Sequence, residues 1–230
     1  MVDFHSHILP AIDDGSRDVA ESLELIKLLK EQGINTVVAT PHFIANQESL
    51  DSFLIRRSNA FNLLKTEFTD NDISILLGAE VKFYPGISRM EGLEKLCIEE
   101  SNILLIEMPF EKWSELTVKE ILEISNLKNL TVVIAHIDRY LSFGVSSAVD
   151  VFVQNGVLIQ ANADFLKGFF NRKKAFKMID SNKLHLIGSD CHNITSRPPK
   201  IGEAYNVIEK NYGSDFVKFM TDFASKKLNS

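Results

Sequence analysis

The chain has few cysteines, no long hydrophobic run and no excess of basic residues, and each absence excludes a class of protein. Only two of its 230 residues are cysteines, Cys97 and Cys191, which is too few for a disulfide framework and typical of a reduced compartment. No apolar run approaches the roughly 20 residues that span a bilayer, and the first residues carry no signal-peptide pattern. The formal net charge of −6 opposes tight binding to a phosphate backbone. We therefore expect a cytoplasmic protein without membrane insertion and without a nucleic-acid partner.

What remains is the composition of an ordinary globular protein. Hydrophobic residues make up 45% of the chain and charged residues 24%, so neither disorder nor a fibrous repeat is indicated. A chain of this length can bury one large core, and no linker-like tract of Pro, Gly or Ser divides it. We expect a single domain over residues 1–230, with the oligomeric state left open.

Short β-branched and apolar segments alternate with longer segments of helical period. We expect strands over residues 2–4, 36–40, 73–77, 102–106, 131–135, 157–159 and 184–188. We expect helices over residues 18–33, 48–67, 115–126, 146–154, 169–180, 203–212 and 215–227. The first helix is the clearest, because Asp18 and Glu21 have capping-box spacing and Gly33 supplies a stop. Alternation of this kind predicts about seven βα units and a parallel sheet.

Almost every expected strand ends in a side chain of metal-binding type. In strand order these are His5 and His7, His42, Glu80, Glu107, His136, Gln160 and Asn162, and finally Asp190 and His192. When parallel strands close into a barrel, their carboxyl ends meet on one face, where the active sites of such folds lie. Because the residues come from all strands and not from one switch point, a barrel fits better than an open sheet. The sequence thus predicts an α/β barrel with one shared pocket.

The individual residues support a metal site. His5 and His7 lie two apart on a strand, so their imidazoles face the same side. Glu80 and Glu107 follow apolar strands, and a carboxylate is costly to bury there unless it is paired or metal-bound. His136 follows an apolar strand in the same way.

Three further features of the sequence, a turn, a histidine and a Cys-x5-Arg spacing, lie close to these residues or resemble them. The Asp13-Asp14-Gly15 segment has the residues of a turn, from which one carboxylate can point back into the pocket. His185 lies inside the last expected strand and is expected to face the core or a helix. Cys191 and Arg197 have the Cys-x5-Arg spacing of cysteine-dependent phosphatases, but the segment between them has no glycine for a phosphate loop. We interpret that spacing as coincidence.

The number of candidate ligands exceeds the three or four that one ion needs, so two or three divalent metal ions are expected. Mixed nitrogen and oxygen ligands without thiolate suit manganese, iron or zinc. Clustered divalent ions lower the pKa of water and stabilise the attacking and leaving oxygens in phosphoryl transfer, which makes phosphate ester hydrolysis their natural use. Arg139 and Arg197 follow His136 and His192 closely and are candidates for binding phosphate oxygens.

These residues resemble the polymerase and histidinol phosphatase (PHP) superfamily and, more narrowly, the bacterial metal-dependent tyrosine phosphatases of capsule and exopolysaccharide loci. The matching segments, in family order, are 5–10 (HSHILP), 12–15 (IDDG), 39–42 (ATPH), 78–80 (GAE), 105–107 (LIE), 134–136 (IAH) with Arg139, and 188–193 (GSDCHN) with 197–199 (RPP). The resemblance implies a distorted seven-unit (β/α)7 TIM-like barrel that holds three metal ions, often manganese.

The resemblance also implies roles for single residues. One ion would be held by His5, His7, Glu80 and Asp190, a second by Glu80, Glu107 and His136, and a third by Asp14, His42 and His192. The implied substrate is a phosphotyrosine-containing protein, a bacterial tyrosine kinase that controls polysaccharide export. This chain departs from the family beside His136, where Ile137-Asp138 replaces the usual Pro-Glu, and the departure bears on substrate preference.

Other interpretations stay open at this point. A phosphatase of small monoesters such as histidinol phosphate, or a nuclease, would use the same metal chemistry, although the acidic composition disfavours the nuclease. A non-enzymatic, metal-stabilised regulatory domain is disfavoured because no candidate ligand is missing. Turnover of a phosphotyrosine peptide, histidinol phosphate and single-stranded DNA would discriminate among them.

Overall fold

The computed structural model describes residues 1–69 and 73–228. Its strands are β1 (Val2–Ser6), β2 (Thr36–Ala39), β3 (His42–Phe43), β4 (Ser74–Leu77), β5 (Glu80–Lys82), β6 (Ile103–Glu107), β7 (Thr131–Ile134), β8 (Leu158–Asn162) and β9 (Leu186–Gly188). All the paired strands run parallel. In β6 and β8 every residue is buried, on both faces of the strand, because helices cover the sheet from outside.

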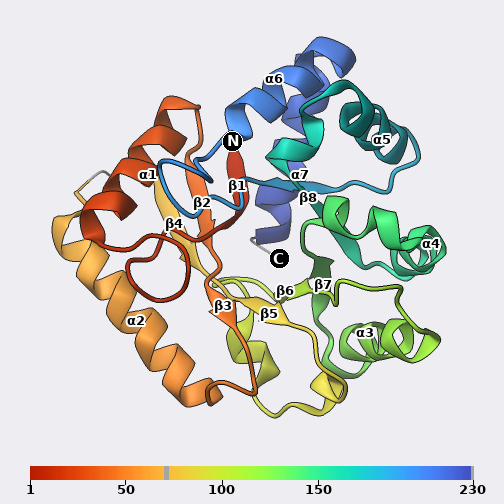
Figure 1. The fold of residues 1–230 in the computed structure, drawn as a ribbon, viewed down its shortest axis with the longest axis horizontal. Helices are drawn as coiled ribbons and strands as arrows, with labels where there is room; N and C mark the ends of the chain where they lie inside the picture. Colours follow the sequence, from red (N-terminus) through yellow and green to blue (C-terminus); the bar gives the residue numbers. More distant parts are fainter. Residues whose placement is uncertain (70–72, 229–230) are drawn as a thin grey trace.

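The strands form a ring of seven positions, in agreement with the seven units expected from the sequence. They pair in the orders β1-β2-β4 and β3-β5-β6-β7-β8-β9. β3 continues the path of β2 beyond Thr40-Pro41, and β5 continues that of β4 beyond Gly78-Ala79, so each pair fills one position. β9 lies next to β1, where the His7 N–H donates to the Cys191 carbonyl at 2.9 Å. The fold is thus a distorted α/β barrel, seen in Figure 1 from the carboxyl ends of its strands.

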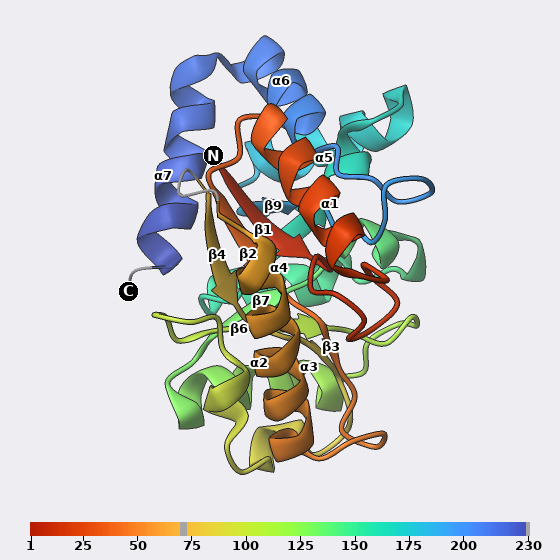
Figure 2. The same cartoon turned by 90° about the vertical axis from the view of Figure 1, so that its left-hand side faces the viewer.

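Seven helices surround the strands in the described part of the chain. They are α1 (Val19–Glu31), α2 (Leu50–Glu67), α3 (Glu115–Lys128), α4 (Ser146–Gln154), α5 (Phe169–Asp180), α6 (Ile201–Tyr212) and α7 (Ser214–Leu228). Short 3-10 turns lie at Ile87–Arg89, Leu93–Leu96, Ile137–Arg139, Leu141–Phe143 and Ala163–Leu166. In Figure 2, α1 and α2 lie in front of β1, β2 and β4, and α7 lies at the left, beside the end from which β1 starts. The opposite end of the barrel, toward which β1 points, is left to the loops.

The helix starts follow the local signals in the sequence. The Asp18 side chain accepts a hydrogen bond from the Glu21 N–H at 2.9 Å and caps α1 as expected, while Gly33 adopts the positive φ of +79° that follows its end. The Glu21 carboxylate accepts from the Arg17 N–H and not from the cap residue itself. Ser49 and Ser114 cap α2 and α3 in the same manner as Asp18.

Several boundaries differ from the expected ones. The short strands β3 and β5 lie outside the segments expected as strands, β8 extends three residues further, to Asn162, and β9 begins only at Leu186. In β8 the extension is held by pairing of Asn162 with Gly188 of the neighbouring strand, which is a long-range contact. Within the described residues we find no helix that combines the length and the apolar character needed to cross a membrane.

Candidate metal centre

The structure brings all nine expected ligand side chains together at the carboxyl ends of the strands. They come from β1 and the loop after it, from β3, β5 and β6, and from the segments after β7 and β9: His5, His7, Asp14, His42, Glu80, Glu107, His136, Asp190 and His192. Eight of them, all but His136, fall into three groups whose nitrogen and oxygen atoms lie within 4.8 Å of one another and could hold a metal ion. The groups share members, so the three form one continuous cluster.

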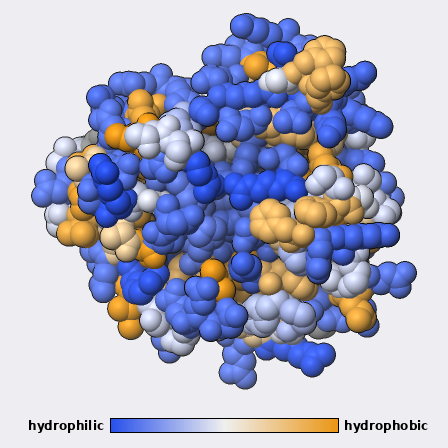
Figure 3. Space-filling view, viewed as in Figure 1, coloured by the Kyte–Doolittle hydropathy of each residue, from blue (hydrophilic) through white to orange (hydrophobic). Residues whose placement is uncertain are grey.

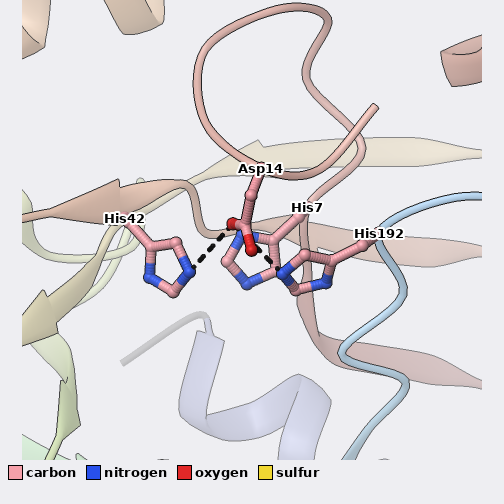
Figure 4. A group of neighbouring side chains, drawn as sticks. All are labelled: His7, Asp14, His42 and His192. Atoms are coloured by element: carbon pink, nitrogen blue, oxygen red, sulfur yellow. Dashed lines mark ion pairs between the residues drawn. The ribbon is translucent and has the colours of Figure 1, made fainter. Parts of the chain in front are cut away.

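The first group contains His7, Asp14, His42 and His192. Figure 4 shows the Asp14 carboxylate between the His42 and His192 rings, with His7 behind it. Asp14 Oδ1 lies 3.2 Å from His42 Nε2 and 3.4 Å from His192 Nε2. The Asp14 side chain is 65% exposed whereas His192 is buried, so this group lies toward solvent at the mouth of the cluster.

The second group, His5, His7 and Asp190, lies deeper. The His5 and His7 Nε2 atoms are 3.1 Å apart, and Asp190 Oδ1 lies 3.7 and 3.5 Å from them. Glu80 Oε2 is 3.3 Å from each of the same two nitrogens. Glu80 therefore belongs with this group by distance, which is where the resemblance also placed it.

The third group contains His42, Glu80 and Glu107. His42 Nδ1 lies 3.0 Å from Glu80 Oε2. His136 Nε2 completes this side of the cluster, 2.6 Å from Glu80 Oε1 and 3.7 Å from Glu107 Oε1. Glu80 thus contacts four imidazoles and stands at the centre of the whole arrangement.

The electrostatics of the cluster favour bound cations. Burial raises the pKa of Glu80, but the charge of His5 and the hydrogen bond from His136 outweigh it and hold the Glu80 pKa well below its usual range. Burial lowers the pKa of His7, yet its contacts with the Asp13 and Glu80 carboxylates raise it to about 10. The ionised carboxylates therefore hold positive charge beside them, which either a protonated imidazole or a bound cation can supply.

The donor set fits a divalent transition metal. The three groups of described residues consist of imidazole nitrogens and carboxylate oxygens, a combination that suits manganese, iron or zinc. Glu80 Oε2 and His192 Nε2 lie inside these groups, are buried and have no hydrogen-bond partner among the described residues, which is unusual for buried polar atoms unless another ligand is expected there. The residues present therefore fit the implied ions.

Asp13 and Asp14 have different roles, which the sequence left undecided. Asp14 belongs to the first group, whereas Asp13 contacts two members of that group, His7 and His42, on the side away from the cluster. Asp13 Oδ2 lies 2.8 Å from His7 Nδ1 and accepts from the His42 N–H at 3.0 Å, and Oδ1 accepts from the Gly15 N–H at 2.9 Å. Burial opposes ionisation of Asp13, but these contacts with His7 outweigh it and hold the pKa of Asp13 well below its usual range. A carboxylate behind a ligating imidazole fixes its tautomer and ring orientation.

Two glycines let the backbone approach the histidines. A Cβ atom on Gly15 would lie 2.3 Å from the His7 carbonyl oxygen, and one on Gly188 would lie 2.6 Å from the His5 Cβ. Any other residue at either position would push the loop or strand away from the cluster. His136 and Asp190 themselves adopt positive φ angles of 31° and 51°, a conformation that costs free energy in non-glycine residues and is found at functional sites.

Gln160 and Asn162 support the cluster from one layer further back, although the sequence placed them at a strand end with the ligands. The Gln160 side-chain oxygen accepts from the His136 N–H at 2.6 Å. The Asn162 amide donates to Asp190 Oδ2 at 2.8 Å, and the Asn162 N–H donates to Asp138 Oδ1 at 2.9 Å. Asp138, at the departure from the family pattern, is thus a partly buried acceptor, and desolvation raises its pKa.

Arg139 and Arg197 converge on the mouth of the cluster. Both guanidinium groups form ion pairs with Asp190 Oδ2, that of Arg197 at 2.8 Å. Their side chains keep about a third of their surface exposed, 33% and 36%. Figure 3 shows strongly hydrophilic side chains across the centre of this face. The two arginines therefore offer fixed positive charge to an anion that enters the site, and their contact with phosphate stays a prediction.

The structure agrees with the interpretations of His185, as a residue outside the site, and of the Cys191-Arg197 spacing, as coincidence. The His185 ring accepts a hydrogen bond from the Ile159 N–H at 3.0 Å and stacks against Phe223 of α7, away from the cluster. The Cys191 thiol is 1% exposed, and burial raises its pKa far above neutrality. A buried, protonated thiol is not a nucleophile, so the Cys-x5-Arg spacing has no catalytic geometry.

The parallel strands form a ring, and a buried cluster of histidines and carboxylates lies at their carboxyl ends with two arginines over it. This arrangement defines a metal-binding barrel enzyme of the hydrolase type. The matching family model is more specific. It is described as capsular polysaccharide synthesis, CpsB/CapC, and it covers residues 1–228, so the chain belongs to this family.

Individual relatives agree with this assignment. The chain is 30% identical over 237 residues to the tyrosine-protein phosphatase YwqE of Bacillus subtilis, covering all of this chain and 92% of that protein. It is 31% identical over 236 residues to the tyrosine-protein phosphatase CpsB of Streptococcus pneumoniae, covering 95% and 93%.

Solved structures share the fold of this chain. The fold matches, with a TM-score of 0.85 and 27% identity, a chain from the crystal structures of YwqE and CpsB, which are described as unique metal-dependent tyrosine phosphatases; the match covers all of this chain and 95% of that one. A lactonase from Listeria monocytogenes, Lmo2620, shares the fold at a TM-score of 0.56 with 11% identity, covering 94% of this chain and 90% of that one.

Proposed function

We propose that this chain is a metal-dependent phosphotyrosine-protein phosphatase. The observation that carries the proposal is the arrangement of the three ligand groups around Glu80, with the guanidinium groups of Arg139 and Arg197 over their mouth. Membership of a family with members named tyrosine-protein phosphatases supports the same reaction. We further propose that residues 1–230 act as one domain.

The proposed ligand sets are those implied by the resemblance. His5, His7, Glu80 and Asp190 would hold one ion, Glu80, Glu107 and His136 a second, and Asp14, His42 and His192 a third. Manganese is the proposed metal, with iron and zinc as alternatives that the same donors accept. Divalent ions bound there would lower the pKa of a water molecule and stabilise charge on the attacking and leaving oxygens.

The chain's own residues would position the ester. Arg139 and Arg197 would bind the non-bridging phosphoryl oxygens, where negative charge grows in the transition state. Water would attack phosphorus, the bond from phosphorus to the phenolic oxygen would break, and tyrosine and inorganic phosphate would leave. A phenol with a pKa of about 10 departs with little protonation.

The proposed substrate is a phosphotyrosine-containing protein, specifically a bacterial tyrosine kinase of a capsule or exopolysaccharide system. We place the reaction in the cytoplasm, since Cys97 and Cys191 are both free and such thiols persist in a reduced compartment.

The experiment that tests the proposal compares three substrates after reconstitution with manganese. We expect rapid release of phosphate from a phosphotyrosine peptide, slow release from histidinol phosphate and no cleavage of single-stranded DNA. Chelation should abolish turnover, and manganese should restore it. Full activity in a verified metal-free preparation, or a preference for histidinol phosphate, would contradict the proposal.

A further inference from the structure

Phe110 is an exposed aromatic side chain next to the metal cluster that none of the roles above uses. It follows Glu107 at the end of β6, and half of its surface is exposed, at 50%. Its ring lies nearly parallel to the His136 imidazole, with the ring centroids 6.3 Å apart and the planes at 14°, and 5.3 Å from the Tyr140 ring. An apolar ring is therefore held at the edge of a cluster composed of charged groups.

The loop that carries Phe110 is fixed on both sides of it. The Met108 N–H donates to the Tyr140 hydroxyl at 3.0 Å, and the Trp113 indole N–H donates to the Pro109 carbonyl at 3.1 Å. The Trp113 ring packs edge-on against Tyr140, with centroids 5.2 Å apart, and both rings are buried. The exposed Phe110 ring therefore lies on a loop that hydrogen bonds and packing hold in place.

The placement of Phe110 relative to Arg139 suggests what it contacts. Arg139 belongs to the turn that starts directly after His136, so we expect a phosphoryl group bound by its guanidinium to lie near the His136 imidazole, which the Phe110 ring faces nearly in parallel. The first atoms beyond the phosphoryl group are those of the alcohol part of the ester. In Figure 3, apolar side chains lie directly beside the hydrophilic centre of this face, so the site offers an apolar surface next to the anion position.

We propose that Phe110 is a specificity-determining residue that packs against the aromatic ring of the substrate and selects aryl over alkyl phosphate monoesters. This inference rests on the proposed function and names a residue that favours its substrate class. Aromatic rings pair with centroids about 4.5–7 Å apart in stacked or edge-on geometry. A phenyl ring gains this contact, whereas the short alkyl chain of phosphoserine offers no ring to pair. Because the Phe110 loop is already ordered, little entropy is lost when the ring binds.

The test combines turnover with a binding measurement. For the manganese-loaded wild type and Phe110→Ala, kcat/KM is measured on a phosphotyrosine peptide and on the same peptide with phosphoserine. Dissociation constants are measured by calorimetry for phenylphosphonate and methylphosphonate, which carry the phosphoryl group with and without a ring. Trp113, the one tryptophan in the chain, reports by fluorescence whether the loop keeps its structure. Phe170→Ala removes a phenylalanine that is 79% exposed on α5 and is the matched control.

We expect Phe110→Ala to lower affinity for phenylphosphonate, and kcat/KM on phosphotyrosine, about three- to tenfold, which is the size of one aromatic pair. Methylphosphonate affinity and phosphoserine turnover should stay unchanged, as should every value for Phe170→Ala. Phe110→Leu should show an intermediate loss. Equal losses on both ligands, or no loss on either, would overturn the role of Phe110 while phosphotyrosine turnover by the wild type still supports the function. Failure of the wild type to cleave phosphotyrosine would overturn the function itself.

Discussion

Asp13→Asn is the sharpest test of how the cluster is held, because Asp13 is expected to act only through other residues. The aspartate accepts three hydrogen bonds, from His7 and the His42 N–H through Oδ2 and from the Gly15 N–H through Oδ1. Asparagine has one oxygen and one NH₂ group in the same volume. It therefore replaces the carboxylate without changing the size of the side chain.

The magnitude follows from the two orientations of the new amide. With its oxygen toward His7 and His42, asparagine keeps both of those contacts and points its NH₂ group at the Gly15 N–H. In the flipped orientation, two N–H donors meet the NH₂ group, so the first orientation is preferred. The partly buried Gly15 N–H then loses its acceptor, which costs about 1–3 kcal/mol of folding free energy. The loss of the charge behind His7 should weaken metal binding about 10- to 100-fold, the usual effect of removing such a partner.

The assay is a manganese titration of the metal-free protein by calorimetry, with thermal melting of the same samples. Asp18→Asn is the matched control, because it removes the same charge from the neighbouring N-cap, where Asn and Asp cap equally well. We expect the affinity of the control to equal that of the wild type. Asp13→Asn protein that melts normally and binds manganese within about twofold of the wild type, a free-energy difference of less than about 0.5 kcal/mol, would refute the role given to Asp13.

Four further predictions test the remaining assignments. Glu80→Gln should lower phosphotyrosine turnover more than about a hundredfold, since Glu80 contacts four imidazoles; a smaller loss of kcat would remove it from the centre. Arg139→Ala should lower the rate of phosphotyrosine turnover but keep its metal content, and both are measured on the same samples. A fall in rate together with a fall in metal content would assign Arg139 a structural role. Cys191→Ala should keep most of its activity, and an inactive variant with full metal content would revive the cysteine mechanism. Burial lowers the pKa of His185 from 6.5 to about 4, so between these values the unfolded chain binds a proton there that the folded chain does not, and stability falls as the pH falls. Urea denaturation at two pH values across this range should show a smaller fall for His185→Gln, and an equal fall would contradict the assignment.

The ligand residues could be predicted from the sequence because two local signals coincide at each of them. An apolar segment indicates a buried strand, and a histidine or carboxylate directly after it lies at the strand's carboxyl end. His136 and Asp190 are examples, each directly after or close behind such a segment. In a parallel barrel those ends share one face, so the convergence followed from the fold class without any knowledge of distances. His185 lies inside the last expected strand and not after it, so it was not expected among the ligands, and its contacts with Ile159 and Phe223 agree.

The supporting residues could not be predicted in the same way, because their roles depend on contacts between distant segments. Nothing local distinguishes Asp13 from Asp14 in the turn they share. The difference arises only when Asp13 meets His7 and the His42 backbone, which is 29 residues away in the chain. Gln160 directly follows an expected strand, as the ligands do, but it lies within β8 and its side-chain oxygen accepts a hydrogen bond from the His136 N–H. A position at the carboxyl end of a strand therefore indicates that a residue lies near the site. It does not indicate whether the side chain binds the metal or supports a residue that does.

The breaks in the barrel explain why Glu80 can contact four imidazoles. Pro41 lacks the N–H that would continue β2, and beyond it β3 and β5 pair in a register that sets His42 opposite Glu80. Parallel neighbours in register point their side chains to the same face, which brings this histidine and this carboxylate to within 3.0 Å of each other. On the other side β5 pairs with β6, where Lys82 is opposite Glu107 and Glu80 lies two residues earlier, so Glu80 and Glu107 share a face as well. The irregular strands, absent from the expected segments, are thus what aligns ligands from neighbouring positions of the ring around one central carboxylate.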